Sequence, residues 1–334
     1  MNGVVVESRS RWGQVGRWAL GLGVAGLSIW LLARDLDWRV LGSVLGSAEY
    51  RWVFVGVLAI IATFFTRAWR WQVLLWQSPL PLRPTMTALL VGQVVNLALP
   101  MRSGDVLRAI WISRGGRISV AAALGSIVVE KIWDLLALLA CGLVLLAWMP
   151  LPQWFRSSTW GTALGLGIGL GLLWAGLHWQ EAFFHGAGWL LARFPAGWDR
   201  AILPRLRRLS HGLDAIRQPG VSLRALFWTG LTWGFGALAN LAVLAAFGIA
   251  PLTSAVVAAV FLLAALMVGG AVPTPGRLGV FEGITVVSLA LFSVPRDQAL
   301  AVGLVLHLVV MGPALLAAAL LAFWPDRRIR RADG

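Results

Sequence analysis

Apolar runs, each followed by a short polar stretch, fill most of the chain. Six of them approach or exceed the length of about 20 residues that a helix needs to cross a bilayer, and they cover 18–33, 52–71, 119–149, 161–178, 225–247 and 299–323. The first run follows Arg9, Arg11 and Arg17 as a signal peptide would, but no small-x-small cleavage site precedes Arg34. We therefore expect six membrane-spanning helices, of which this run is the first.

Two further apolar regions are interrupted by proline and glycine. The run 85–99 stops at Pro100-Met-Arg102-Ser-Gly104, and the apolar residues 106–112 are too few to span. The run 252–272 stops at Pro273-Thr-Pro275-Gly-Arg277-Leu-Gly279, and 280–294 follows. Irregular backbone at membrane depth is tolerated where protein or a water-filled cavity satisfies its polar groups. We expect broken, re-entrant hairpins at 84–113 and 252–294, although two full spans remain an alternative for the second.

The two interruptions also resemble each other, because both read Pro-x-Arg-x-Gly, at Pro100–Gly104 and at Pro275–Gly279. Each half of the chain reads span, span, broken hairpin, span, and we place the halves at 1–149 and 150–334. Three full spans per half is an odd number, so the halves must face opposite sides of the membrane. The predicted fold is an all-α polytopic membrane protein with six full spans and two broken hairpins in an inverted repeat.

Composition excludes a water-soluble enzyme. The chain is 59% hydrophobic and 13% charged, whereas soluble domains average about 25% charged residues. Its net charge of +14 comes almost entirely from arginines between apolar runs, which favours contact with anionic lipid headgroups over nucleic acid. The single cysteine, Cys141, excludes a disulfide framework and a zinc site made of cysteines.

The placement of the arginines predicts the orientation. The positive-inside rule puts both termini, the 67–83 loop and the arginine-rich stretch 179–222 in the cytoplasm, which implies a multi-pass protein of the cytoplasmic (inner) membrane. Apolar residues at helical spacing predict that 179–222 forms an amphipathic helix in the headgroup plane. A soluble helix packed on the bundle is the alternative.

Each interruption places an arginine, Arg102 or Arg277, just before the start of a helix. Paired interruptions in corresponding halves point to a transporter's binding site, and helix N-termini and guanidinium groups favour an anion, phosphate above all. The candidate residues around the two breaks are Arg102, Gly104, Asp105, Arg108, Pro275, Arg277, Gly279 and Glu282. Alternatively, Arg102 and Arg277 pair with acids such as Asp105 and Glu282 and lock the hairpins, and both interpretations can hold together.

Ionisable residues inside the predicted spans form a second candidate group. Glu130 and Asp134 lie four residues apart and share a helix face. Both stay ionised only beside cations, and the available partners are Arg102, Arg108, Arg277 and, one position off the face, Lys131. The alternatives are one protonated acid, which would suit proton coupling, and a purely structural set of ion pairs.

Two other polar residues complete the candidate site. His307 lies in the last run, at a place that roughly corresponds to Glu130 in the repeat. Asn96 precedes the first interruption, and like Gln93 and Asn240 it is expected to serve helix packing first and site lining second.

Three ordered motifs, over nearly the whole chain, resemble the lysylphosphatidylglycerol synthase transmembrane region family of flippase-like integral membrane proteins. They are Asn96-x-x-x-Pro-x-Arg-x-Gly-Asp105-x-x-Arg108, Glu130-Lys-x-x-Asp134 and Pro273-x-Pro-Gly-Arg277-x-Gly-x-x-Glu282, and the Arg67-Ala-Trp-Arg70-Trp71 end of the second run also fits. Two positions depart from the family pattern: Arg277 replaces a second glycine, and His307 stands where an arginine is expected.

The resemblance implies lipid handling. Members with an appended aminoacyltransferase domain attach lysine to phosphatidylglycerol and translocate the product; this chain ends soon after its last run, so we expect that catalytic domain to be absent. Stand-alone relatives are thought to move or expose phospholipids or lipid-linked glycans.

The predicted function is therefore a lipid translocase, not an enzyme, in which Arg102, Arg108 and Arg277 hold an anionic phospholipid or lipid-linked phosphate headgroup. Asp105, Glu130, Asp134 and Glu282 would balance charge. No phosphate-binding nucleotide loop is present, and we expect no cofactor or metal. An ion gradient, the membrane potential or the lipid gradient itself must therefore drive transport. The alternatives are an intramembrane enzyme acting on a lipid phosphate, and a scaffold that recruits a glycosyltransferase or lipid synthase through 179–222.

Overall fold

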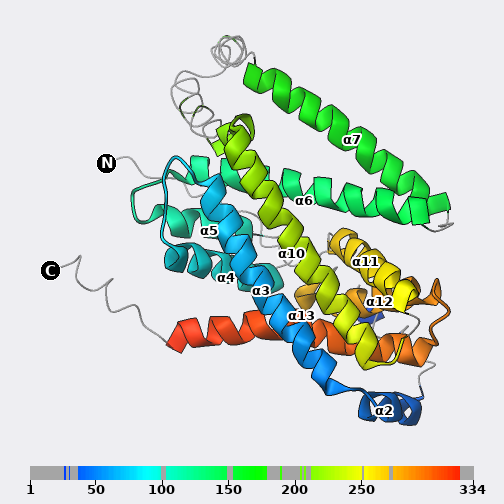
Figure 1. The fold of residues 1–334 in the computed structure, drawn as a ribbon. Coiled ribbons are helices and arrows are strands. Elements are labelled where there is room, and N and C mark those ends of the chain that lie inside the picture. Colours follow the sequence, from blue (N-terminus) through cyan, green and yellow to red (C-terminus); the bar gives the residue numbers. More distant parts are fainter. Residues whose placement is uncertain are drawn as a thin grey trace.

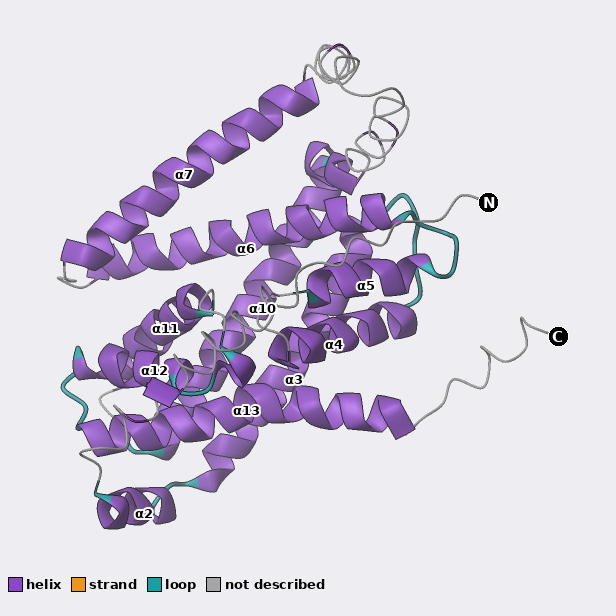
Figure 2. Cartoon of the chain, turned by 180° about the vertical axis from the view of Figure 1, so that it is seen from behind, coloured by secondary structure: helices purple, strands orange, loops and turns teal. Residues whose placement is uncertain are grey.

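The structure is a computed structural model. It describes residues 37–98, 103–148, 153–178, 212–249, 252–270 and 274–323, together with 26, 27, 30, 189, 204 and 207. Every regular element in these ranges is a helix (Figures 1 and 2). The predicted all-α class is therefore confirmed. Most of the run 18–33 and most of the stretch 179–222 lie outside the described residues.

The helices follow the predicted apolar runs closely. Their bounds are α2 Trp38–Gly46, α3 Tyr50–Leu74, α4 Leu82–Ala98, α5 Gly104–Ser113, α6 Val120–Trp148, α7 Gln153–His178, η1 Asp214–Arg217, α10 Pro219–Ala246, α11 Leu252–Gly269, η2 Pro275–Arg277, α12 Val280–Ala290 and α13 Arg296–Phe323. Within the described residues, α3, α10 and α13 are long and apolar enough to cross a membrane. The 29-residue α6 is as long, but it carries three charged residues in mid-helix. The chain is a polytopic membrane protein; the number of six spans stays a prediction.

One described helix, α2, lies outside the predicted apolar runs, between 18–33 and 52–71. The Asp37 carboxylate caps it by accepting hydrogen bonds from the backbone N–H groups of Arg39 (2.9 Å) and Val40 (3.3 Å). Such a cap satisfies two of the N–H groups that a helix start leaves unpaired, which is why so short a helix forms here.

The antiparallel pair of α3 and α10 forms the centre of the molecule (Figure 1). At one end the Glu49 N–H donates to the Ala246 carbonyl at 2.9 Å. Further along, the Thr232 hydroxyl donates to the Thr66 hydroxyl at 2.8 Å. At Gly56 the two backbones lie close, because a Cβ there would be in van der Waals contact, at 3.4 Å, with the Ala239 carbonyl oxygen of α10. The two helices are thus joined along their length by contacts between residues far apart in sequence.

The predicted hairpin ranges each contain two short helices, α4 with α5 and α11 with α12. Gly92 and Gly104 lie where α4 meets α5, and a Cβ on Gly104 would overlap the Gly92 carbonyl oxygen. The Asn96 side-chain oxygen accepts from the Gly104 N–H at 2.8 Å, which closes the first hairpin beside its break. Residues 99–102, and with them Arg102, lie outside the described residues.

Contacts between the two halves are reciprocal. The hairpin helix α4 packs on α13, and the corresponding helix α11 packs on α6. Likewise α5 packs on α6 as α12 packs on α13, and the two long helices run in opposite directions across the central pair (Figure 1). This is the contact pattern expected of a two-fold repeat; the halves 1–149 and 150–334 and their opposite orientation in a membrane stay predictions.

We expect Gly104→Ala to lower the stability of the first hairpin. The added methyl group must displace the α4 backbone at Gly92, and overpacking of this kind costs about 1–3 kcal/mol. The thermal unfolding midpoint in detergent measures the effect. Gly234→Ala is the matched control, because a Cβ at Gly234 meets nothing within 4 Å; equal midpoints for the two variants would contradict the close contact.

Candidate functional site

The two carboxylates of α6, Glu130 and Asp134, share one buried face of the helix and are bridged by Arg70 of α3. The Arg70 guanidinium lies 2.7 Å from an Asp134 oxygen and 3.3 Å from a Glu130 oxygen. It also donates to the Thr229 hydroxyl of α10 at 3.2 Å. One side chain, only 1% exposed, thus joins α3, α6 and α10.

A second arginine, Arg108 of α5, pairs with Glu130 from the opposite side. Its Nη1 donates to Glu130 Oε2 at 3.0 Å, and its Nε lies 3.2 Å from Asp105. The ring of Trp71 covers its guanidinium at 4.9 Å, an arrangement that stabilises a cation. Lys131 pairs with Asp105 at 3.6 Å.

These side chains form the charge cluster, which we define as Arg70, Asp105, Arg108, Glu130, Lys131 and Asp134. The sequence correctly indicated that the two α6 acids need cations, but the bridging cation is Arg70 rather than Arg277. Asp105 pairs with Arg108 and Lys131. The alternative in which it pairs with Arg102 falls outside the described residues.

The second hairpin has its own buried pair. His307 of α13 contacts Glu282 of α12 through Nδ1 at 2.5 Å, and its Nε2 contacts the Gly276 carbonyl at 2.9 Å. The other Glu282 oxygen accepts from the Gly279 N–H at 2.8 Å, at the start of α12. His307 rather than Arg277 therefore holds Glu282.

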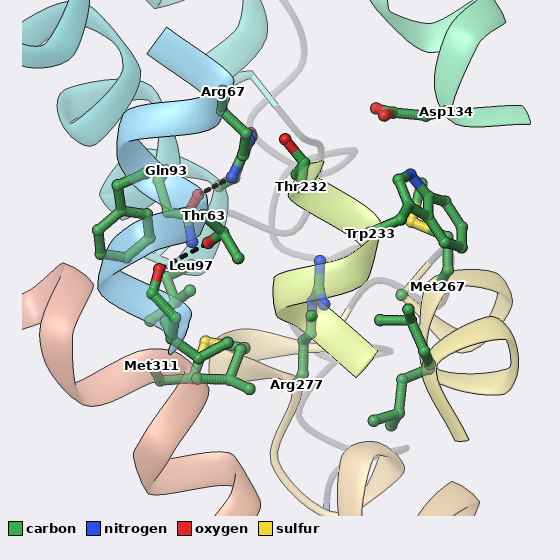
Figure 3. A pocket seen from close by; sticks show the side chains of 18 of the residues that line it. Thr63, Arg67, Gln93, Leu97, Asp134, Thr232, Trp233, Met267, Arg277 and Met311 are labelled. Atoms are coloured by element: carbon green, nitrogen blue, oxygen red, sulfur yellow. Dashed lines mark hydrogen bonds between the residues drawn. The ribbon is translucent and has the colours of Figure 1, made fainter. Parts of the chain in front are cut away.

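A cavity of about 310 Å³ lies between the charge cluster and the second hairpin (Figure 3). Residues of both predicted halves line it, from α3, α4, α5, α6, α10, α11, α12 and α13. Its polar lining comprises Thr63, Arg67, Arg70, Gln93, Asn96, Asp105, Lys131, Asp134, Thr232, Asn240, Thr274 and Arg277. Ligand pockets usually begin at about 300 Å³, so the space suits one small polar group.

The charge on the cavity wall is unbalanced. Among the described residues that line it, four side chains are cationic (Arg67, Arg70, Lys131 and Arg277) and two are anionic (Asp105 and Asp134). Arg67 donates to the Gln93 side chain at 2.6 Å, which orients its guanidinium. The Thr274 hydroxyl is buried and has no hydrogen-bond partner in the described part of the chain. A cavity wall with excess positive charge and a hydroxyl that can still donate a hydrogen bond favours an anion.

Arg277 enters the cavity from the turn before α12, opposite the side from which Asp134 faces it (Figure 3). Its φ is +58°, directly after Gly276 at +59°. A non-glycine residue in this region is strained by about 1–2 kcal/mol. Glycine, which the family pattern has at this position, would adopt this φ without strain. This chain has an arginine there instead and carries the strain.

The twelve predicted site residues divide into three groups. Asn96, Asp105, Asp134 and Arg277 line the cavity. Gly104, Arg108, Glu130, Pro275, Gly279, Glu282 and His307 belong to the hairpins and ion pairs around it but are not part of its wall. Arg102 lies outside the described residues.

Sequence reasoning missed Arg67 and Arg70 as site residues. Both fall within α3, although the positive-inside rule counted both with a cytoplasmic loop at 67–83. Their spacing of three residues puts them on one helix face, a signal that was available. No local signal connected that face to α6.

A family model supports what the motifs indicated. The model of the lysylphosphatidylglycerol synthase TM region matches residues 18–318. The chain belongs to this family. The match includes every residue that lines the cavity. No curated protein and no solved structure matches the chain. Membership in the lysylphosphatidylglycerol synthase TM region family relates this membrane protein to lipid handling.

In this family member, we expect Arg70→Met to destabilise the fold by about 3–5 kcal/mol, because it leaves two buried carboxylates short of a cation. Unfolding in detergent checks this. Arg83→Ala, at an exposed position of α4, is the control and should change stability by less than about 0.5 kcal/mol.

The double variant Arg70→Met/Asp134→Leu should recover part of the lost stability, since it removes one of the stranded acids. If Arg70→Met alone unfolds like the wild type, Arg70 does not hold α6 to α3.

Proposed function

We propose that the protein is a lipid translocase that moves an anionic phospholipid, or a lipid-linked phosphate, across the cytoplasmic membrane. The observation that carries this proposal is the cavity between apolar helices whose described wall has more cationic than anionic side chains. A cavity open to a headgroup, with the acyl chains left in the bilayer, is what lipid transport requires.

The headgroup would be held mainly by Arg67 and Arg277, and Lys131, which pairs with Asp105 at 3.6 Å, adds positive charge to the same wall. Arg67 and Arg277 reach the cavity from opposite sides, α3 and the turn before α12 (Figure 3), so a phosphate between them would accept charge-assisted hydrogen bonds from both. Thr274 and Thr232 add hydroxyl groups on the wall. Arg108, which was predicted to hold the headgroup, is already committed to Glu130 and Asp105, and we assign it to positioning α5.

Both predicted halves contribute to the wall, as expected of a transporter in which one repeat rocks against the other around a central site. Rocking would open the cavity to one membrane face at a time. We place both termini in the cytoplasm, following the arginine distribution. Translocation leaves the lipid chemically unchanged, so we propose that the protein is not an enzyme.

The first test is native mass spectrometry of gently solubilised protein. The wild type should retain a defined anionic lipid, and Arg277→Gly should retain at least about tenfold less, because one charge-assisted hydrogen bond contributes about 1.5–3 kcal/mol. Arg277→Gly should unfold within about 1 kcal/mol of the wild type, because glycine relieves the positive φ. Arg83→Ala serves as the control.

Equal lipid retention in all three proteins would refute the cavity as the headgroup site. It would favour the scaffold alternative, in which 179–222 recruits a synthase.

The second test is transport itself, in liposomes that contain fluorescent phosphatidylglycerol. Wild-type protein should move the lipid between leaflets with no change in its mass, and Arg67→Gln and Arg277→Gly should slow the movement at least about tenfold. A lipid product of altered mass would instead indicate an intramembrane enzyme.

A further inference from the structure

The contacts of His307 fix the number of protons that it holds together with Glu282. The Gly276 carbonyl can only accept a hydrogen bond, so the Nε2 that contacts it at 2.9 Å must carry a proton. Nδ1 lies 2.5 Å from a Glu282 oxygen. A bare ring nitrogen and a carboxylate oxygen would repel at that distance, so a second proton must lie between them. The pair therefore holds one proton more than a neutral imidazole beside a carboxylate.

This proton is enclosed by protein. Glu282 is 5% exposed and His307 9% exposed, and the Phe281 ring lies 4.7 Å from the imidazole. The charged side chains on α13 and on the helices packed against it are Arg39, Arg51, Arg67, Arg70, Arg83, Arg224, Glu282, Arg296 and Asp297. Among them, only Glu282 contacts the ring in the described part of the chain.

The same two contacts hold the turn that carries Arg277. His307 binds the carbonyl of Gly276, the peptide group that joins it to Arg277, and Glu282 binds the Gly279 N–H on the other side. If the extra proton leaves, the remaining one can serve Gly276 or Glu282 but not both. One of the two contacts to α13 is then lost, and α13 keeps only one of its two links to the segment that carries Arg277.

We propose that His307 and Glu282 form a proton-binding site that couples protonation to the position of Arg277 in the cavity. The proton comes from water and is shared between Nδ1 and the Glu282 oxygen, with no covalent change. The inference rests on the proposed headgroup site. Because coupling is reciprocal, a proton that holds Arg277 in place strengthens headgroup binding, and headgroup binding draws a proton into the pair.

The test is calorimetric titration of the detergent-solubilised full chain with short-chain phosphatidylglycerol, at pH 6 to 8 and in two buffers of different ionisation enthalpy. The lipid phosphodiester keeps one charge throughout this range. We expect wild-type affinity to fall by on the order of fivefold or more as pH rises, with net proton uptake on binding. His307→Gln keeps an amide donor for Gly276 but cannot titrate, so its affinity should change less than twofold and its proton uptake should vanish.

The matched control is His178→Gln, which removes a histidine at the end of α7 and should behave like the wild type. If wild type and His307→Gln share one pH dependence, the coupling is refuted even though lipid binds. If neither protein binds the lipid at any pH, the proposed headgroup site is refuted, and the spectra described next decide the proton site on their own.

A separate measurement then decides the proton site. In ¹⁵N-histidine spectra, the His307 signals, identified by their loss in His307→Gln, should be those of a ring in which both nitrogens carry or share a proton. The Glu282→Gln variant should shift them. Signals of a neutral ring with one bare nitrogen would refute the proton site whatever the lipid result.

Discussion

The fold depends most on the ion pairs that Arg70 forms with the two carboxylates of α6. A charged group at the centre of a bilayer is costly on its own, so α6 is a poor membrane helix in isolation. Ion pairs with Arg70 and Arg108 lower the cost of burying the charge of its acids. Because Arg70 lies on α3 and also contacts α10, the side chain that pairs with both acids of α6 also links α6 to the central pair. The ion pairs thus specify which helices pack together, whereas apolar packing alone is compatible with many helix arrangements.

The broken hairpins place polar backbone beside this cluster. A short helix cannot span the bilayer, and its end leaves N–H and carbonyl groups that need partners. At the first hairpin Asn96 supplies one for Gly104, and at the second Glu282 supplies one for Gly279. The side chains that close each hairpin lie next to the cavity. The groups that satisfy the backbone at the breaks therefore also bring polar atoms to the site. A cavity at this depth is a consequence of the interruptions.

Much of the fold could be predicted from sequence because apolar runs, prolines and glycines act locally. The bounds of α3, α6 and α13 follow from run length, and the breaks follow from the two Pro-x-Arg-x-Gly motifs. The partner of Asp134 could not be found in this way, since Arg70 lies 64 residues earlier and no local pattern connects them. Arg277 was predicted as a site residue from its place before a helix start, and it lines the cavity; its binding of a headgroup stays a prediction. The backbone strain at Arg277 could not be predicted from sequence, because it exists only in the folded turn.

The two halves use different residue types to join a hairpin helix to a long helix. In each, a charged residue of the second hairpin helix pairs with the last long helix, Arg108 with Glu130 and Glu282 with His307. The first pair includes an arginine, which stays charged at any physiological pH, and it is reinforced by Arg70 and Trp71. The second consists of two groups that can both lose or gain a proton, and it has no other charged contact in the described part of the chain. If one half rocks against the other as we propose, one hairpin would hold its place while the other changes its contacts. In the transport cycle that we propose, the permanent ion pairs would keep the first hairpin in place. The second hairpin, which has the His307–Glu282 pair and carries Arg277, would be the side that moves.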